Sequence, residues 1–100
     1  MYYLLRCRVY PGQFSDEYAV SAEEANGNRF SLFVPSNHVR PVAPPSRETT
    51  VDGLMRVDLC DESNETALVK LPRESFESGR FVTVRRDQLE LAPQPLEPQP

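Results

Sequence analysis

A single histidine and two cysteines are the side chains of this 100-residue chain best suited to nucleophilic or acid–base chemistry. His38 is the only histidine, so imidazole-based catalysis would have to use it. A lone histidine within a polar turn is more often solvated than catalytic. Cys7 and Cys60 form no CxxC pair and leave no ligand set for zinc. We expect two free thiols, no enzymatic activity, no metal and no other cofactor.

Acidic residues gather in one short polar segment, 58–65. Its oxygen-bearing side chains are of the kind that calcium prefers: Asp58, Asp61, Glu62, Asn64 and Glu65. Their spacing does not match an EF-hand loop, and the glycine that such a loop requires is absent. The segment therefore predicts a solvated hairpin tip.

Basic residues are most concentrated between positions 70 and 86, where phenylalanines interleave with them. This combination binds single-stranded nucleic acids, because cations contact phosphates and aromatic rings stack on bases. The residues that would form such a site are Arg73, Phe76, Arg80, Arg85 and Arg86. Acidic residues in the same stretch would neutralise much of the field, and the net charge of −4 disfavours a phosphate partner. Nucleic-acid binding is therefore the alternative function.

The elements that must position these side chains are strands, because apolar residues recur at every second position. The alternating segments are 3–9, 18–22, 30–34, 55–59, 67–71 and 82–84. Pro11-Gly12 and Asn26-Gly27 predict turns between strands in the first half. The only segments that could form a single helical turn are 21–25 and 73–78.

The two halves of the chain align at an offset of 50 residues. The clearest correspondence places Leu5, Cys7 and Val9 on Met55, Val57 and Leu59. We predict two tandem three-stranded β-meander repeats, 1–42 and 51–91, joined by a proline-rich linker, 43–50. Packed together, they would form an all-β, six-stranded small barrel or sandwich with approximate two-fold symmetry, because each hides the other's sheet edge. Two separate mini-barrels are the alternative, and we expect the Pro/Gln-rich tail, 92–100, to be disordered.

Residues 33–39, Phe-Val-Pro-Ser-Asn-His-Val, lead from a strand into a proline-containing turn. This segment resembles the end of an SH3 domain, where a strand runs through Pro-Ser-Asn-Tyr-Val into a 3₁₀ turn. The resemblance implies small-barrel geometry, and it places Pro35, Asn37 and His38 among the residues that line a peptide groove. His38 stands where the family has a tyrosine, and the tryptophan of the groove is absent because the chain contains none.

Three large side chains alternate with the apolar face of the first strand: Tyr2, Leu4 and Tyr10. If all three are exposed, they form an apolar patch of the kind that marks interfaces. This outer face also carries Arg6, Arg8 and Arg56, and we expect cross-strand pairing with acidic residues such as Asp58 to satisfy them. The patch therefore favours a protein partner or a second copy of the chain.

Composition and hydropathy bear on the cellular location and the source of the protein. The first residues lack the basic and apolar regions of a signal peptide, and no apolar run is long enough to span a membrane. We expect a cytoplasmic protein with no membrane partner. Isoleucine is absent and lysine occurs once against ten arginines, which is typical of a GC-rich genome and favours a bacterial source.

The function predicted from these observations is that of a non-catalytic protein-interaction module. The residues predicted to contact its partner are Tyr2, Leu4, Tyr10, Pro35, Asn37 and His38. A small ligand held in the seam between the repeats is a third hypothesis.

Overall fold

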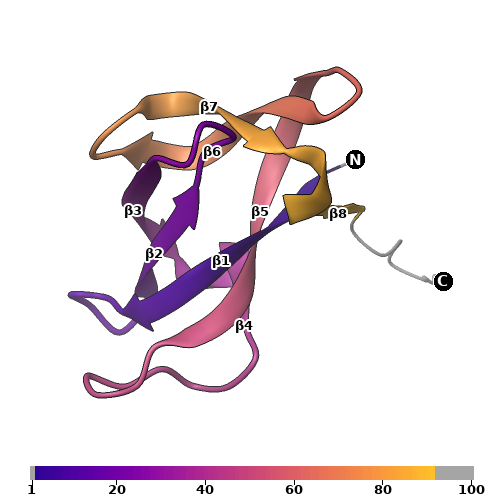
Figure 1. The fold of residues 1–100 in the computed structure, drawn as a ribbon. Helices are drawn as coiled ribbons and strands as arrows, with labels where there is room; N and C mark the ends of the chain where they lie inside the picture. Colours follow the sequence, from indigo (N-terminus) through magenta and orange to yellow (C-terminus); the bar gives the residue numbers. More distant parts are fainter. Residues whose placement is uncertain (1, 92–100) are drawn as a thin grey trace, which may run out of the picture.

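The computed structural model describes residues 2–91, which consist almost entirely of strands (Figure 1). The first half contains β1 (Tyr3–Pro11), β2 (Glu17–Glu23), β3 (Arg29–Pro35), the 3₁₀ turn η1 (Ser36–His38) and β4 (Val39–Pro41). The second half repeats this order with β5 (Val51–Glu62), β6 (Thr66–Ser75), β7 (Gly79–Arg85), η2 (Arg86–Gln88) and β8 (Leu89–Leu91). The predicted all-β class is confirmed. The tail predicted at 92–100 lies outside the described residues.

Within the described residues, one antiparallel sheet runs through both halves of the chain. Its strands are ordered β3-β2-β1-β5-β6-β7, with β4 paired to β5 and β8 paired to β1. The long strands β1 and β5 cross the middle of the molecule, and the sheet curls around them into a half-barrel (Figure 1). The two halves therefore share one sheet and do not form separate mini-barrels.

The register of the central strands follows the offset of 50 residues. Leu5 on β1 lies opposite Met55 on β5, its counterpart in the other half. Val39 on β4 also pairs with Met55, and Leu89 on β8 pairs with Leu5. Each half thus gives its last short strand to the first strand of the other half. This exchange adds a fourth strand to each predicted three-stranded unit, and the internal duplication itself stays a prediction.

The core lies inside the curl of the sheet and draws on both halves. Alternation places the inward residues of every long strand there, because successive side chains of a strand point to opposite faces. The largest fully buried side chains are Phe30, Leu5, Leu32, Met55, Leu71, Val9, Val20, Val34, Val57, Val69 and Val84. The periodicity of two in the sequence therefore identified the core positions correctly.

Backbone hydrogen bonds tie the outer strands of the two halves together. The Phe76 N–H donates to the Ser31 carbonyl at 2.8 Å, and the Ala25 N–H donates to the Thr83 carbonyl at 2.8 Å. The Glu77 carboxylate accepts from both the backbone N–H of Ser31 at 2.7 Å and its hydroxyl at 2.8 Å. These bonds occupy part of the edges that β3 and β7 would otherwise expose.

The connections explain where the strands end. Gly27 and Gly79 adopt φ values of +92° and +73°, a left-handed conformation that costs glycine little, and each stands at a hairpin. The single helical turns considered for 21–25 and 73–78 are wrong, because β2 continues to Glu23 and β6 to Ser75. Pairing with neighbouring strands overrides the weak helical tendency of these polar segments. The predicted 3₁₀ turn after Pro35 is confirmed as η1.

Candidate functional site

Two adjoining hollows lie where η1 meets the outer side of β1, β5 and β6. One has a volume of about 200 Å³ and the other about 90 Å³, and both are lined by His38 and Arg56. We call the two hollows together the basic groove. Its charged and polar lining consists of Tyr2, Asn37, His38, Arg40, Arg56, Asp58, Lys70 and Arg80. Four permanent cations therefore face one carboxylate in a protein whose net charge is −4.

Two of the groove's guanidinium groups are held in place by uncharged partners. The Arg56 guanidinium lies over the Tyr2 ring, 4.0 Å from the ring centroid. This cation–π contact holds the guanidinium beside the ring and supplies no carboxylate as counter-charge. Arg80 donates from Nε to the Leu71 carbonyl at 2.9 Å and from Nη2 to the Pro72 carbonyl at 3.1 Å. Both cations are positioned without an ion pair to a carboxylate.

The 3₁₀ turn forms one wall of the groove. Pro35 starts the turn with its fixed φ, and the Val39 N–H donates to the Ser36 carbonyl to close it. The Asn37 side-chain oxygen lies 2.8 Å from His38 Nδ1, so the imidazole is oriented by its neighbour in the sequence. Polar donors and acceptors of the turn therefore stand beside the cations of the strands.

Ion pairing distinguishes the groove from the rest of the surface. Six ion pairs occur among the described residues, and they use Arg6, Arg8, Arg29, Arg85 and Arg86. None of the six includes a cation of the groove. Asp58 lies opposite Lys70 in the sheet register, yet no ion pair joins them within residues 2–91. The groove therefore gathers four unpaired cations, whereas the other two unpaired arginines of the described residues, Arg47 and Arg73, lie outside it.

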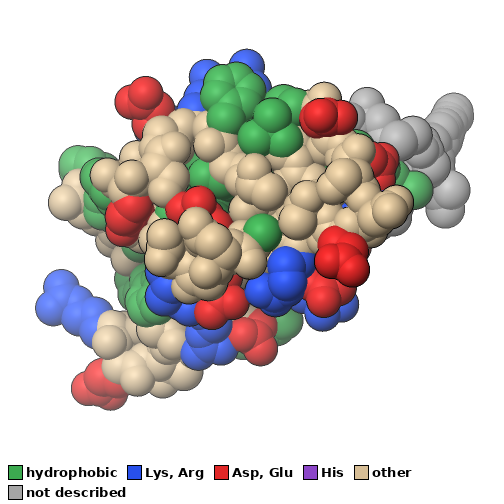
Figure 2. All heavy atoms as spheres, turned by 45° about the horizontal axis from the view of Figure 1, so that its top comes forward, with side chains coloured by type: hydrophobic (Ala, Val, Ile, Leu, Met, Phe, Trp, Pro, Cys, Tyr) green, Lys and Arg blue, Asp and Glu red, His purple; other side chains and the backbone are tan. Residues whose placement is uncertain are grey.

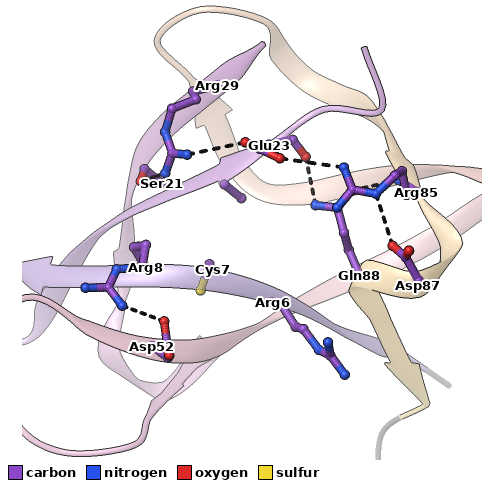
Figure 3. Close-up of a pocket in the computed structure, with 11 residues that line it drawn as sticks. Arg6, Cys7, Arg8, Ser21, Glu23, Arg29, Asp52, Arg85, Asp87 and Gln88 are labelled. Atoms are coloured by element: carbon purple, nitrogen blue, oxygen red, sulfur yellow. Dashed lines mark hydrogen bonds and ion pairs between the residues drawn. The ribbon is translucent and has the colours of Figure 1, made fainter. Parts of the chain in front are cut away.

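A second cleft shows the contrasting arrangement (Figure 3). This arginine cleft has a volume of about 380 Å³ and is lined by Arg6, Arg8, Arg29 and Arg85. Arg8 pairs with Asp52 at 2.6 Å, while Glu23 lies between Arg29 at 3.7 Å and Arg85 at 3.6 Å. Arg8, Arg29 and Arg85 thus pair with carboxylates of the cleft (Figure 3), whereas Arg6 pairs with Glu90 outside its lining.

The arginine cleft occupies the position in the second half that the basic groove has in the first. At the offset of 50, Arg56 corresponds to Arg6 and His38 to Gln88, and both Arg6 and Gln88 line the cleft. Gln88 is buried, and its amide donates to the Glu23 carbonyl at 2.9 Å. Equivalent places in the fold therefore carry different charge, and only one of them keeps free cations.

The structure gathers four of the six predicted partner-binding residues in the basic groove. Tyr2, Leu4, Asn37 and His38 line the same hollow. Leu4 is buried there, because its sheet partners Arg56 and Glu90 carry long side chains that cover it. The condition for an exposed patch of Tyr2, Leu4 and Tyr10 is thus not met.

The other two predicted partner-binding residues lie away from the groove. Tyr10 is at the opposite end of β1 from Tyr2, and eight residues of extended strand span about 26 Å. Pro35 ends β3, where it pairs with Glu17. Pro35 therefore sets the direction of the turn, but it does not line the hollow beside Tyr2.

The residues considered for nucleic-acid binding do not form one site. Arg80 lines the basic groove, whereas Arg85 pairs with Glu23 and Asp87, and Arg86 pairs with Glu62 at 3.0 Å. Phe76 is exposed at the β6–β7 turn and packs edge-on against Phe33. Arg73 lies on β6 outside the groove's lining residues. The sequence cluster is therefore distributed over several surfaces.

Three cations of the groove were not singled out as binding residues from the sequence: Arg40, Arg56 and Lys70. Arg56 was expected to pair with a carboxylate across the sheet, and it stacks on Tyr2 instead. Lys70 is the only lysine, which is the one signal that could have drawn attention to it. The expected pairing is found for Arg6 with Glu90 at 3.4 Å and for Arg8 with Asp52.

The other surfaces of the described residues show no comparable hollow lined by unpaired cations. Along the lower edge of the face in Figure 2, acidic and basic side chains lie next to one another. No group of three or more potential metal ligands occurs among residues 2–91. In the segment 58–65, residues 58–62 belong to β5 and only 63–65 form the hairpin tip. Within the same range, no helix has the length and apolarity needed to cross a bilayer.

Comparison of the chain with protein-family models, curated proteins and solved structures yields no match. The candidate site therefore rests on the geometry and charge of this chain alone.

Proposed function

We propose that the protein is a non-catalytic interaction module that binds a partner protein through the basic groove. The observation that carries this proposal is the set of unpaired cations: Arg40, Arg56, Lys70 and Arg80 line the groove and take part in none of the six ion pairs of the described residues. An anionic group of a partner would supply the missing counter-charge at a site whose donors are already in position.

The shape of the groove supports a protein partner. Its volume is small, and it is bordered by a 3₁₀ turn, an aromatic ring and strands. An extended polypeptide segment fits such a surface hollow, and aromatic residues and arginines are the side chains that contribute most at protein interfaces. The resemblance of residues 33–39 to the peptide-binding turn of SH3 domains points the same way. Both cysteines are free thiols, which supports a reducing, cytoplasmic setting.

Nucleic acid is the alternative partner, and one observation favours it: free cations and an aromatic ring lie together in the groove. Against it, two of the other arginines considered for this role, Arg85 and Arg86, are already paired with carboxylates, and Arg73 lies outside the groove. A phosphate-driven complex would weaken steeply as salt is raised, because counterion release drives its formation.

The test is affinity capture from bacterial lysate with the full chain and two charge-reversed variants. Arg56→Glu reverses one groove cation, and Arg47→Glu makes the same change at an exposed residue outside the groove. We expect a defined protein to be retained by the parent and by Arg47→Glu after nuclease treatment, and to be lost with Arg56→Glu. Equal retention by all three proteins, or recovery of nucleic acid alone, would contradict the proposal.

A further inference from the structure

The cations of the basic groove have a definite spacing, which carries information about the partner. Arg56 and Asp58 lie two residues apart on β5 and therefore share a face of the sheet. Lys70 on β6 lies directly opposite Asp58. Arg56 and Lys70 are consequently diagonal neighbours, and such pairs are separated by about 7–8 Å.

Arg80 adds a third cation next to this pair. Its guanidinium is bound to the carbonyls of Leu71 and Pro72, the two residues that follow Lys70 on β6. These bonds use Nε and Nη2 of Arg80 and leave Nη1 available. Arg56 lies over the Tyr2 ring and donates no side-chain hydrogen bond within residues 2–91, so its N–H donors stay free for a carboxylate.

Alternate side chains of an extended chain match this spacing. Residues i and i+2 of a strand point the same way and lie about 6.6 Å apart. We propose that the groove recognises an extended acidic segment with carboxylates at positions i and i+2, one bound by Arg56 and the other by Lys70 and Arg80. This inference rests on the proposed function, and it names the chemical class of the partner.

Two features make carboxylates better suited to the groove than phosphates of a nucleic acid. Asp58 lies two residues from Arg56 on β5 and opposite Lys70, so it would repel a continuous run of phosphates, whereas carboxylates on alternate residues leave an uncharged position between them. Guanidinium edges also match a planar carboxylate through paired N–H bonds. The expected ligand is therefore short, extended and intermittently charged.

The experiment measures fluorescence anisotropy of labelled nine-residue peptides with the full chain. One peptide carries glutamates at i and i+2, a second carries them at i and i+1, and a third has glutamine at both positions. We expect the first to bind about tenfold more tightly than either of the others, because each of those loses at least one charge-assisted hydrogen bond. Arg80→Gln should remove this preference, while Arg47→Gln should leave it unchanged.

The outcomes separate this inference from the proposed function. If capture of a partner depends on Arg56 but the three peptides bind equally, the spacing rule is wrong and the interaction module stands. If an oligothymidylate binds more tightly than the first peptide, and Arg56→Glu abolishes that binding, the groove serves nucleic acid and both proposals fail. Circular dichroism of each variant confirms that the fold is retained.

Discussion

The two thiols of the protein provide a quantitative test of the structure, because one is buried and the other is exposed. Cys7 points into the core from β1, whereas Cys60 is exposed near the end of β5. Burial raises the pKa of the Cys7 thiol from its ordinary 9.0 to about 12, and the nearby charge of Asp52 adds to the effect. Only the thiolate attacks disulfide reagents, so this difference controls reactivity.

The expected reaction rates follow from that pKa. A rise of three pKa units lowers the thiolate fraction of Cys7 at pH 8 by about a thousandfold. In the native protein, 5,5′-dithiobis(2-nitrobenzoate) should therefore label one thiol quickly, and Cys60→Ser should remove that fast phase. Unfolding in guanidinium chloride should make both thiols reactive. Fast labelling of Cys60→Ser under native conditions would refute the placement of Cys7 in the core.

The same pKa predicts how stability depends on pH. In the unfolded chain Cys7 ionises from about pH 9, while in the folded protein it keeps its proton up to about pH 12. The contribution of the protonated Cys7 thiol to the free energy of unfolding is therefore complete below pH 9 and is lost as the pH rises towards 12. Between pH 8 and pH 10 the free energy of unfolding should fall by about 1.4 kcal/mol more in the parent than in Cys7→Ala. Equal slopes for the two proteins in urea unfolding experiments would refute the argument.

Two further substitutions test the core and the closure between the halves. Phe30→Ala removes a side chain with no exposed surface and should lower the free energy of unfolding by about 3–5 kcal/mol. Circular dichroism should show a melting temperature lower by at least about 12 °C. The control Phe81→Ala, at a half-exposed residue, should change the melting temperature little. The hydrogen bonds from Ser31 lower the pKa of the Glu77 carboxyl below its ordinary 4.5. These bonds therefore stabilise the folded protein above pH 4.5, and the stabilisation is lost as the pH falls through the folded-state pKa. Glu77→Gln should accordingly be less stable than the parent at pH 7, and the difference should disappear at acidic pH.

The alternation of apolar residues was enough to predict the strands and the core. Leu5 and Val9 are fully buried because a strand presents every second side chain to the same face. The hairpin at Gly27 and the turn after Pro35 were equally readable, since both depend on local backbone preferences. These features depend on the residues of a short segment and not on where that segment lies in the fold, so they can be predicted from the sequence.

The candidate site could be predicted only in part. The resemblance of the turn to SH3 domains pointed to Asn37 and His38, and both line the groove. Arg56 was interpreted as one of several arginines on the polar face of the sheet. Its contact with Tyr2 depends on β1 lying beside β5, a pairing of segments about 50 residues apart.

Local periodicity and backbone conformation decided which segments form strands, which face of each strand is turned to the core and where the chain turns. Tertiary structure alone decided that β4 pairs with β5 and β8 with β1, that Leu4 is covered, and which cations lack a carboxylate. Charge balance at a given place depends on side chains contributed by several distant strands. No periodicity along the chain records which of those strands become neighbours.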